Sequence, residues 1–229
     1  MDLPGDLDAR RFSAARPPAV LLGGLNVLRA LGRGGIPVIV ASSSSDEAAF
    51  ASLYCRGRLR LPALDDRRAV ADRLLRLGES LAHALGRRLP LFYSNDDWQR
   101  LVQDYRSELM QHYTLLLNEP GVARAVIDKD LFQSLAAARG LPIPRIVDWD
   151  MLERFAGPVL VKPRTKFAAD VSAVYSQLFA PQGKARIFPN GRALFTNEAA
   201  RRMRGQLLIQ EYVEGGDSHI WSFHGFADE

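Results

Sequence analysis

A stretch of mixed apolar and acidic residues near the end of the sequence is the part best suited to hold a ligand. It spans residues 207–217 and reads Leu-Leu-Ile-Gln-Glu-Tyr-Val-Glu-Gly-Gly-Asp. The apolar beginning predicts a buried strand, and extended backbone at 211–213 can offer a carbonyl and an N–H group to the edge of adenine. Glu214 or Asp217 would then place a carboxylate near ribose hydroxyls. A surface turn explains the same pattern, so both interpretations stay open.

Two lysines precede this stretch. Lys162 follows the apolar run Val159–Val161 and precedes Pro163. Burying an unpaired ammonium group is unfavourable, so this side chain must reach a partner or water, and a phosphate group would satisfy it. Lys129 follows Asp128 at the predicted start of a helix. An ordinary exposed helical lysine explains that position equally well.

Two loops in the first half of the chain follow predicted strands. Gly23 and Gly24 precede a predicted helix, so this turn either receives an anion at the helix N-terminus or is only too tight for larger residues. The Gly-x-Gly-x-x-Gly dinucleotide pattern is absent from this turn. Asn95 and Asp96 belong to a Ser-Asn-Asp-Asp run that suits a helix cap and also a ligand loop. Adjacent acids with no third ligand nearby make a poor metal site, so we expect no metal there.

The order of predicted elements indicates the fold class. Strand, glycine turn, helix and strand form a βαβ unit, which predicts a parallel sheet with a right-handed crossover. In the first half we expect strands at 19–22, 36–41, 58–61 and 90–93, and helices at 25–34, 65–85 and 98–113. After the Asn-Glu-Pro-Gly sequence at 118–121, we expect helices at 128–138 and 197–203, and strands at 159–161 and 207–210. The sequence therefore predicts an α/β protein with a domain boundary near residue 118.

The composition narrows the class of protein. A chain of 229 residues is long enough for one large or two small domains. The net charge is +4, but the arginines are scattered along predicted helices, and no nucleic-acid motif accompanies them. The single cysteine, Cys55, permits no internal disulfide and fits a reducing cytoplasm. No apolar run reaches the roughly 20 residues of a membrane span, and the polar residues 1–18 are expected to form a flexible tail.

The order of the motifs resembles the ATP-grasp superfamily, and most closely its carbamoyl-phosphate-synthase-like carboxylate–amine ligases. The motifs are Asp-Lys at 128–129, Gly-Leu-Pro-Ile-Pro at 140–144, Val-Lys-Pro at 161–163 and Gln-Glu-Tyr-Val-Glu-Gly at 210–215. The resemblance implies a Rossmann-like pre-ATP-grasp domain at residues 19–118. It also implies an ATP-grasp α+β domain at 119–229 that is incomplete at its C-terminus.

Carried over residue by residue, the resemblance implies a nucleotide site. Lys129 and Lys162 would hold the phosphates of ATP. The hinge acid Glu211 and its two successors, Tyr212 and Val213, would contact adenine.

Ribose would be bound by Asp217, with Glu214 as the alternative.

The chain departs from the family after Pro163, where a glycine-rich loop usually covers the phosphates. Here no glycine follows until Gly183. A loop of different design or a weaker grip on the phosphates is therefore expected.

The resemblance also implies a reaction. A small-molecule carboxylate would attack the γ-phosphate of ATP, and an amine or thiol would displace phosphate from the resulting acyl-phosphate. Gly23, Gly24, Asn95 and Asp96 would face the active cleft and contact these substrates. The family's Mg²⁺ ligands would lie beyond residue 229. We therefore expect the N-terminal part of a ligase, either an expressed fragment or a shortened relative, that is inactive by itself.

Other interpretations stay open at this point. The chain is alternatively a catalytically inactive nucleotide-binding module or a degenerate ATP-grasp scaffold. A nucleic-acid-binding protein has only the basic charge in its favour, and we expect neither a nucleic-acid nor a membrane partner. The first domain offers a surface for a homodimer, although the sequence leaves the oligomeric state open.

Overall fold

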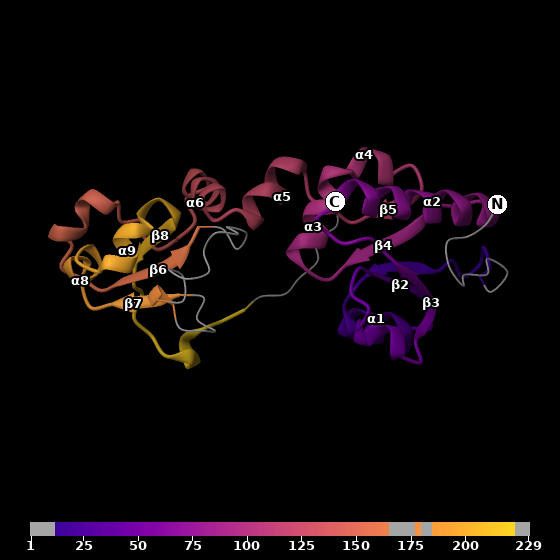
Figure 1. Cartoon of the computed structure of the whole chain (residues 1–229), viewed down its shortest axis with the longest axis horizontal. Coiled ribbons are helices and arrows are strands. Elements are labelled where there is room, and N and C mark those ends of the chain that lie inside the picture. The colour runs from indigo at the N-terminus through magenta and orange to yellow at the C-terminus, as the bar shows by residue number, and fades with distance from the viewer. Residues whose placement is uncertain (1–11, 165–176, 180–184, 223–229) are drawn as a thin grey trace. The chain divides into compact units, whose positions relative to one another are not determined.

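The computed structural model describes residues 12–164, 177–179 and 185–222 (Figure 1). The chain divides into two compact units, Met1–Ala123 and Arg124–Glu229. Together they form a mixed α/β protein with one parallel and one antiparallel sheet, which confirms the predicted fold class. The functional names given to the two predicted domains stay predictions. Among the described residues, no helix is long and apolar enough to cross a membrane.

The first unit is built on a parallel sheet with the strand order β3-β2-β1-β4-β5. Its strands are β1 (Ala19–Leu22), β2 (Val38–Ser42), β3 (Cys55–Arg60), β4 (Leu89–Tyr93) and β5 (Tyr113–Leu115). Every residue of β1 and β2 is buried. Continuous apolar runs of this kind are expected where helices cover both faces of a parallel sheet.

Helices cover both faces of this sheet. One face carries α1 (Leu25–Arg33) and the 3₁₀ helix η2 (Ala48–Ala51), and the other carries α2 (Arg67–Leu85), α3 (Asp96–Asp104) and α4 (Arg106–Leu109). Alternate residues of β1 enter different cores, because side chains alternate along a strand. Val20 and Leu22 pack with residues of α2, whereas Leu21 packs with Leu28 of α1.

The predicted helix at 98–113 is wrong at its C-terminal end. The chain leaves α4 after Leu109, and Tyr113 begins β5. The Tyr113 side chain is fully buried, and its hydroxyl donates a 2.6 Å hydrogen bond to the Leu74 carbonyl of α2. Burial raises the pKa of Tyr113 above its ordinary value. This contact with α2 fixes the last strand of the sheet against a helix.

Gly78 of α2 is the residue that makes room for the Tyr113 ring. A Cβ atom at Gly78 would lie 2.6 Å from the Tyr113 ring. We expect Gly78→Ala to lower the free energy of unfolding by about 1–3 kcal/mol through overpacking. Helix propensity alone predicts the opposite sign, a gain of about 1 kcal/mol. Urea denaturation followed by circular dichroism measures the difference.

Glu79→Ala is the matched control, because Glu79 is exposed on the same helix. Its free energy of unfolding is expected to stay within about 0.5 kcal/mol of the unmodified chain. A Gly78→Ala variant as stable as this control would show that Tyr113 does not need the space at Gly78.

The second unit contains an antiparallel sheet with the strand order β7-β6-β8. Its strands are β6 (Val159–Pro163), β7 (Arg186–Phe188) and β8 (Leu207–Glu211). Its helices are α6 (Lys129–Ala138), η3 (Trp149–Arg154), α8 (Gly191–Phe195), α9 (Glu198–Arg202), η4 (Arg204–Gln206) and η5 (Asp217–His219), while α5 (Pro120–Ile127) contains the division between the units.

The two faces of the antiparallel sheet differ in character. Val159 and Val161 of β6 are buried in an apolar core with Leu194 of α8 and Ala200 of α9. Lys162 alternates with these residues, so it belongs to the opposite face of the sheet. The helices α8 and α9 therefore cover one face and leave the lysine on the other.

Candidate functional site

Strand β8 has a neighbour on each side. On one side β6 pairs with it along its full length. On the other side the chain at 145–147 runs antiparallel to β8, with a bridge between Ile146 and Gln210. The Glu211 N–H donates to the Arg145 carbonyl at 2.9 Å, and the Val147 N–H donates to the Ile209 carbonyl at 3.0 Å. The backbone of β8 is thereby held from both edges up to Glu211.

The pairing between Glu211 and Arg145 is irregular. In a regular antiparallel pair the two residues exchange both N–H···O=C bonds. Here the Arg145 N–H donates instead to Oε1 of the Glu211 side chain, at 2.8 Å. No described residue donates to the Glu211 carbonyl, which faces the same edge as its N–H. The side chain has replaced the backbone as the acceptor.

The next two residues continue this pattern. The Tyr212 N–H donates to the Pro158 carbonyl at 3.0 Å, on the β6 side. The Val213 N–H has no acceptor among the described residues, and the Val213 side chain is 65% exposed. An acceptor at residue 211 and a donor at residue 213 are therefore left available by the described part of the chain.

The Glu211 carboxylate has a structural role at this position. Its Oε2 lies 3.5 Å from Nε of Arg145, and the Arg145 guanidinium lies 5.3 Å from the centre of the Phe155 ring. The sequence motif did not reveal Arg145, because its partner Glu211 is 66 residues away. Of the two residues predicted to bind ribose, Glu214 is exposed. Asp217 begins η5, and its side chain lies outside the described part of the structure.

Lys162 lies on the face of the antiparallel sheet opposite to the α8–α9 core. It is half-buried and pairs with Leu208 of β8, while Leu160 pairs with Gln210. Leu208 is 2% exposed and Gln210 is 4% exposed. Among the described residues, no side chain or carbonyl forms an ion pair or hydrogen bond with the Lys162 ammonium group. An anion on this face would provide the missing partner.

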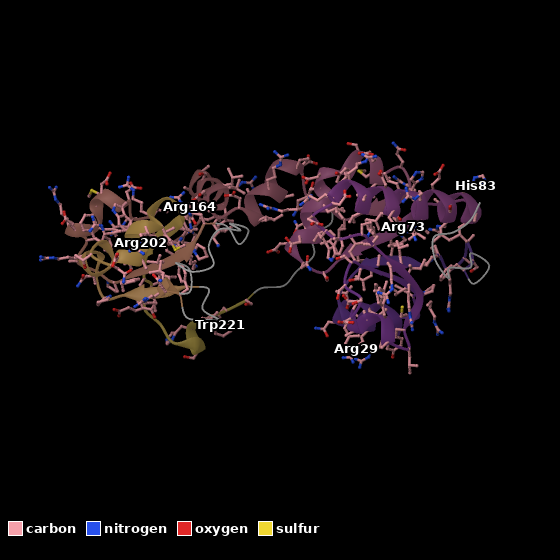
Figure 2. All side chains as sticks on the ribbon, viewed as in Figure 1. Arg29, Arg73, His83, Arg164, Arg202 and Trp221 are labelled. Carbon is pink, nitrogen blue, oxygen red and sulfur yellow. The ribbon has the colours of Figure 1, made fainter. Side chains whose placement is uncertain are left out.

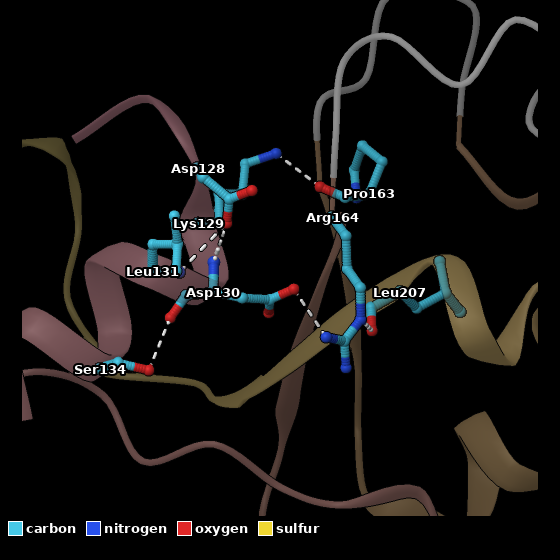
Figure 3. A network of polar contacts seen from close by, with 8 residues as sticks. All are labelled: Asp128, Lys129, Asp130, Leu131, Ser134, Pro163, Arg164 and Leu207. Carbon is cyan, nitrogen blue, oxygen red and sulfur yellow. Dashed lines mark hydrogen bonds and ion pairs between the residues drawn. The ribbon is translucent and has the colours of Figure 1, made fainter. Parts of the chain in front are cut away.

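Lys129 reaches the same end of β6 from helix α6 (Figure 3). The Asp128 side chain caps the helix by accepting from the Asp130 and Leu131 N–H groups at 2.9 and 3.1 Å. From the first turn, the Lys129 ammonium donates to the Pro163 carbonyl at 2.5 Å. The structure thus brings Lys129 to the residue that follows Lys162.

The Arg164 side chain connects the end of β6 to both α6 and β8. Its Nη1 lies 2.7 Å from Oδ2 of Asp130, and its Nε donates to the Leu207 carbonyl at 3.0 Å (Figure 3). The sequence motif did not indicate this role, because Asp130 is 34 residues away. The glycine-poor loop expected after Pro163 falls on residues 165–176, outside the described residues.

A second group of polar residues lies at the carboxyl ends of β1 and β4 in the first unit. The chain continues from β1 to β2 on one side of this pair and from β4 to β5 on the other side. In parallel sheets, ligands often bind at the carboxyl ends of neighbouring strands whose connections diverge in this way. Gly23 and Gly24 turn the chain there with φ of 68° and 85°. The Ser94 hydroxyl donates to the Leu22 carbonyl at 2.9 Å. A Cβ at Gly24 would lie 2.5 Å from Cβ of Ser94, so the close approach itself requires glycine.

The remaining members of this group are Asn95 and Asp96, which the sequence analysis singled out, and Glu47, which it did not. Asn95 caps α3, since its Oδ1 accepts from the Asp97 and Trp98 N–H groups at 3.1 Å. Asp96 is the first residue of that helix. A Cβ at Gly23 would lie 3.4 Å from the Glu47 carboxylate, so this acid also borders the turn.

Metal ligands are not grouped in the described residues. No set of three or more His, Cys, Asp or Glu side chains within them could hold a metal ion. The described residues therefore do not fit a magnesium site of their own.

The fold is similar to that of ATP-grasp ligases. The L-amino acid ligase of Bacillus licheniformis superposes with a TM-score of 0.59 at 14% identity, over 87% of this chain and 45% of that one. The N5-carboxyaminoimidazole synthetase of Staphylococcus aureus, complexed with ADP, superposes with a TM-score of 0.58 at 13% identity, over 88% of this chain and 48% of that one. These matches confirm the predicted resemblance at the level of the fold.

A third solved structure of the same fold is a biotin carboxylase domain. It belongs to the 2-oxoglutarate carboxylase of Hydrogenobacter thermophilus and contains MgADP, ADP and bicarbonate. It superposes with a TM-score of 0.54 at 16% identity, over 86% of this chain and 44% of that one. No protein-family model and no curated protein matches the chain. The chain spans about half the length of the solved structures that it matches.

The exchange of acceptors at Glu211 can be tested directly. We expect Glu211→Ala to turn the Arg145 N–H to the carbonyl of residue 211, because that carbonyl completes the regular pair. The free energy of unfolding should change by only about 1 kcal/mol, since one hydrogen bond replaces another. NMR detects the new bond as a through-hydrogen-bond coupling between the amide nitrogen of residue 145 and the carbonyl carbon of residue 211.

Glu211→Gln is the control, because its side-chain oxygen still accepts from the Arg145 N–H. The coupling should be absent in this variant and in the unmodified chain. Its presence in the unmodified chain would mean that the Glu211 carbonyl is already engaged.

Proposed function

We propose that the second unit binds ATP along the end of β8 and the Lys162 side of its antiparallel sheet, and serves as the nucleotide-binding part of a carboxylate–amine ligase. The observation that carries the proposal is the pair of backbone groups left at the end of β8, the Glu211 carbonyl and the Val213 N–H. Groups two residues apart on extended backbone point to the same side. Adenine carries the groups that would pair with them: an exocyclic amino group that donates and a neighbouring ring nitrogen that accepts.

The lysines support the same orientation of the nucleotide. Lys162 is half-buried on the sheet face opposite to α8 and α9, and Lys129 reaches the end of the same strand. Adenine at the end of β8 would direct the phosphates toward these lysines, because β6 and β8 are antiparallel neighbours. Compact ammonium charges suit phosphate oxygens. Ribose would then lie near Glu214 or Asp217.

The proposed reaction begins with a small-molecule carboxylate. A carboxylate oxygen forms a bond to the γ-phosphorus of ATP while the bond to the β–γ bridging oxygen breaks, which releases ADP. An amine or thiol then attacks the acyl carbon, and inorganic phosphate leaves with the former carboxylate oxygen. Lys129 and Lys162 lower the energy of these steps by neutralising phosphate charge rather than by forming covalent bonds. Mg²⁺ would supply charge neutralisation of the same kind, although the described residues do not form its site.

The substrate contacts are proposed for the first unit. The Gly23–Gly24 turn and the Asn95–Asp96 loop border the carboxyl edge of a parallel sheet, which is where such sheets hold ligands. Exposed N–H groups at the start of α1 suit a carboxylate, since no side chain caps that helix. The free Cys55 agrees with a cytoplasmic location, which is part of the same proposal.

Removal of Lys162 tests the nucleotide site. We expect Lys162→Ala to weaken ADP binding at least about tenfold, equivalent to about 1.4 kcal/mol, because a phosphate loses its half-buried cation. Isothermal titration calorimetry measures the affinity. Arg192→Ala is the control, since Arg192 is an exposed cation on α8, on the other side of the sheet. Equal ADP affinity in the Lys162→Ala variant and the unmodified chain would exclude Lys162 from the phosphate site.

Turnover separates the ligase from a nucleotide-binding module without activity. The chain is mixed with ATP, Mg²⁺ and pooled amino acids as carboxylates and amines, and the ADP formed is measured. ADP formation that requires the amino acids supports ligase activity in this chain. Nucleotide binding without ADP formation favours the inactive module.

A further inference from the structure

A pocket of about 500 Å³ lies in the helical layer of the second unit. It is formed by η3, α8, α9 and η4. The helices α8 and α9 contribute Leu194 and Ala200 to the core beneath Val159 and Val161. Lys162 belongs to the opposite face of this sheet. The pocket is therefore separate from the proposed nucleotide site.

Two aromatic rings form an apolar part of this pocket. Trp149 of η3 and Phe195 of α8 have ring centres 5.9 Å apart and planes inclined by 38°. Both side chains are half-buried and pack against the apolar core, so their positions are fixed. A fixed aromatic surface that remains partly accessible can stack with a flat ring.

Arginines surround this aromatic surface. Arg201 and Arg202 of α9 and Arg204 of η4 line the pocket, against the acids Asp150 and Glu198. Glu198 is paired with Arg202, one helical turn away (Figure 2 labels Arg202). Among the described residues, Arg201 and Arg204 form no ion pair or side-chain hydrogen bond. Two exposed guanidinium groups are thus available to an anion beside the rings.

We propose that this pocket binds a small planar aromatic molecule that carries a carboxylate or a phosphate. The ring would stack on one of the two aromatic rings and contact the other, and the anionic group would accept from Arg201 and Arg204. A guanidinium group matches both anions through two parallel hydrogen bonds. The volume lies within the roughly 300–1,000 Å³ of small-molecule sites.

A purely structural role accounts for only part of this arrangement. Arg201 and Arg202 lie in the last turn of α9, where cations interact favourably with the helix dipole. Arg204 lies beyond that helix, and the dipole does not account for the aromatic surface beside it. The combination of rings and unpaired arginines is what points to a ligand.

The test uses two probes with the full chain, 2-naphthoate for the carboxylate and 2-naphthyl phosphate for the phosphate, with 2-naphthol as the uncharged comparison. Binding is followed by calorimetry and by the indole N–H resonance of Trp149 in NMR spectra. We expect at least one anion to bind and to shift the Trp149 resonance, while the Trp221 resonance stays unchanged. Which anion binds identifies the charged group that the pocket prefers.

Variants of the arginines determine whether the pocket is responsible. Arg201→Gln combined with Arg204→Gln should weaken binding at least tenfold, whereas Arg192→Gln on α8 should not change it. The proposal is overturned if neither anion shifts the Trp149 resonance, or if the double variant, folded by circular dichroism, binds as tightly as the unmodified chain.

Discussion

The carboxylate of Glu211 occupies the place that a backbone carbonyl takes in a regular strand pair. By accepting from the Arg145 N–H it closes the outer edge of β8 and leaves the carbonyl of the same residue without a donor in the described part of the chain. Most backbone N–H and C=O groups in a sheet form hydrogen bonds within the sheet. A binding edge at the end of a strand therefore requires some substitute for the normal pairing, and here a side chain provides it. The availability of the Val213 N–H follows from where this pairing stops.

The side chains of β6 alternate between the two faces of its sheet, and the two faces have different roles. Val159 and Val161 anchor the strand in an apolar core, so Lys162 cannot move far from its position on the other face. Contacts of Lys129 and Arg164 then bring α6 to the end of this strand. The cationic groups are thus positioned by packing and by backbone carbonyls. A preformed arrangement of this kind loses less entropy when an anion binds.

Local patterns were sufficient to predict the parallel sheet and most of its helices, because continuous apolar runs and helical periodicity are local signals. They failed at Tyr113, where apolar spacing continues past Leu109 although the ring packs against Gly78 of a distant helix. Lys162 was noticed because a charged residue after an apolar strand is conspicuous, whereas Lys129 was singled out only by the family resemblance, and the phosphate-binding role of both stays a prediction. Arg145, Arg164 and Glu47 were not, since each acquires its role from a partner that only folding brings near.

Pro163 ends β6 beyond the described pairing of this strand with β7. Among the described residues, the pairing of β6 with β7 extends to Val161, and the backbone groups of residue 163 point to the β7 side. A proline has no N–H to donate, so this position needs no acceptor on that side. The Pro163 carbonyl accepts from Lys129 of α6. The last residue of β6 therefore tolerates proline, because its single backbone polar group is bonded to the side chain of a helix residue.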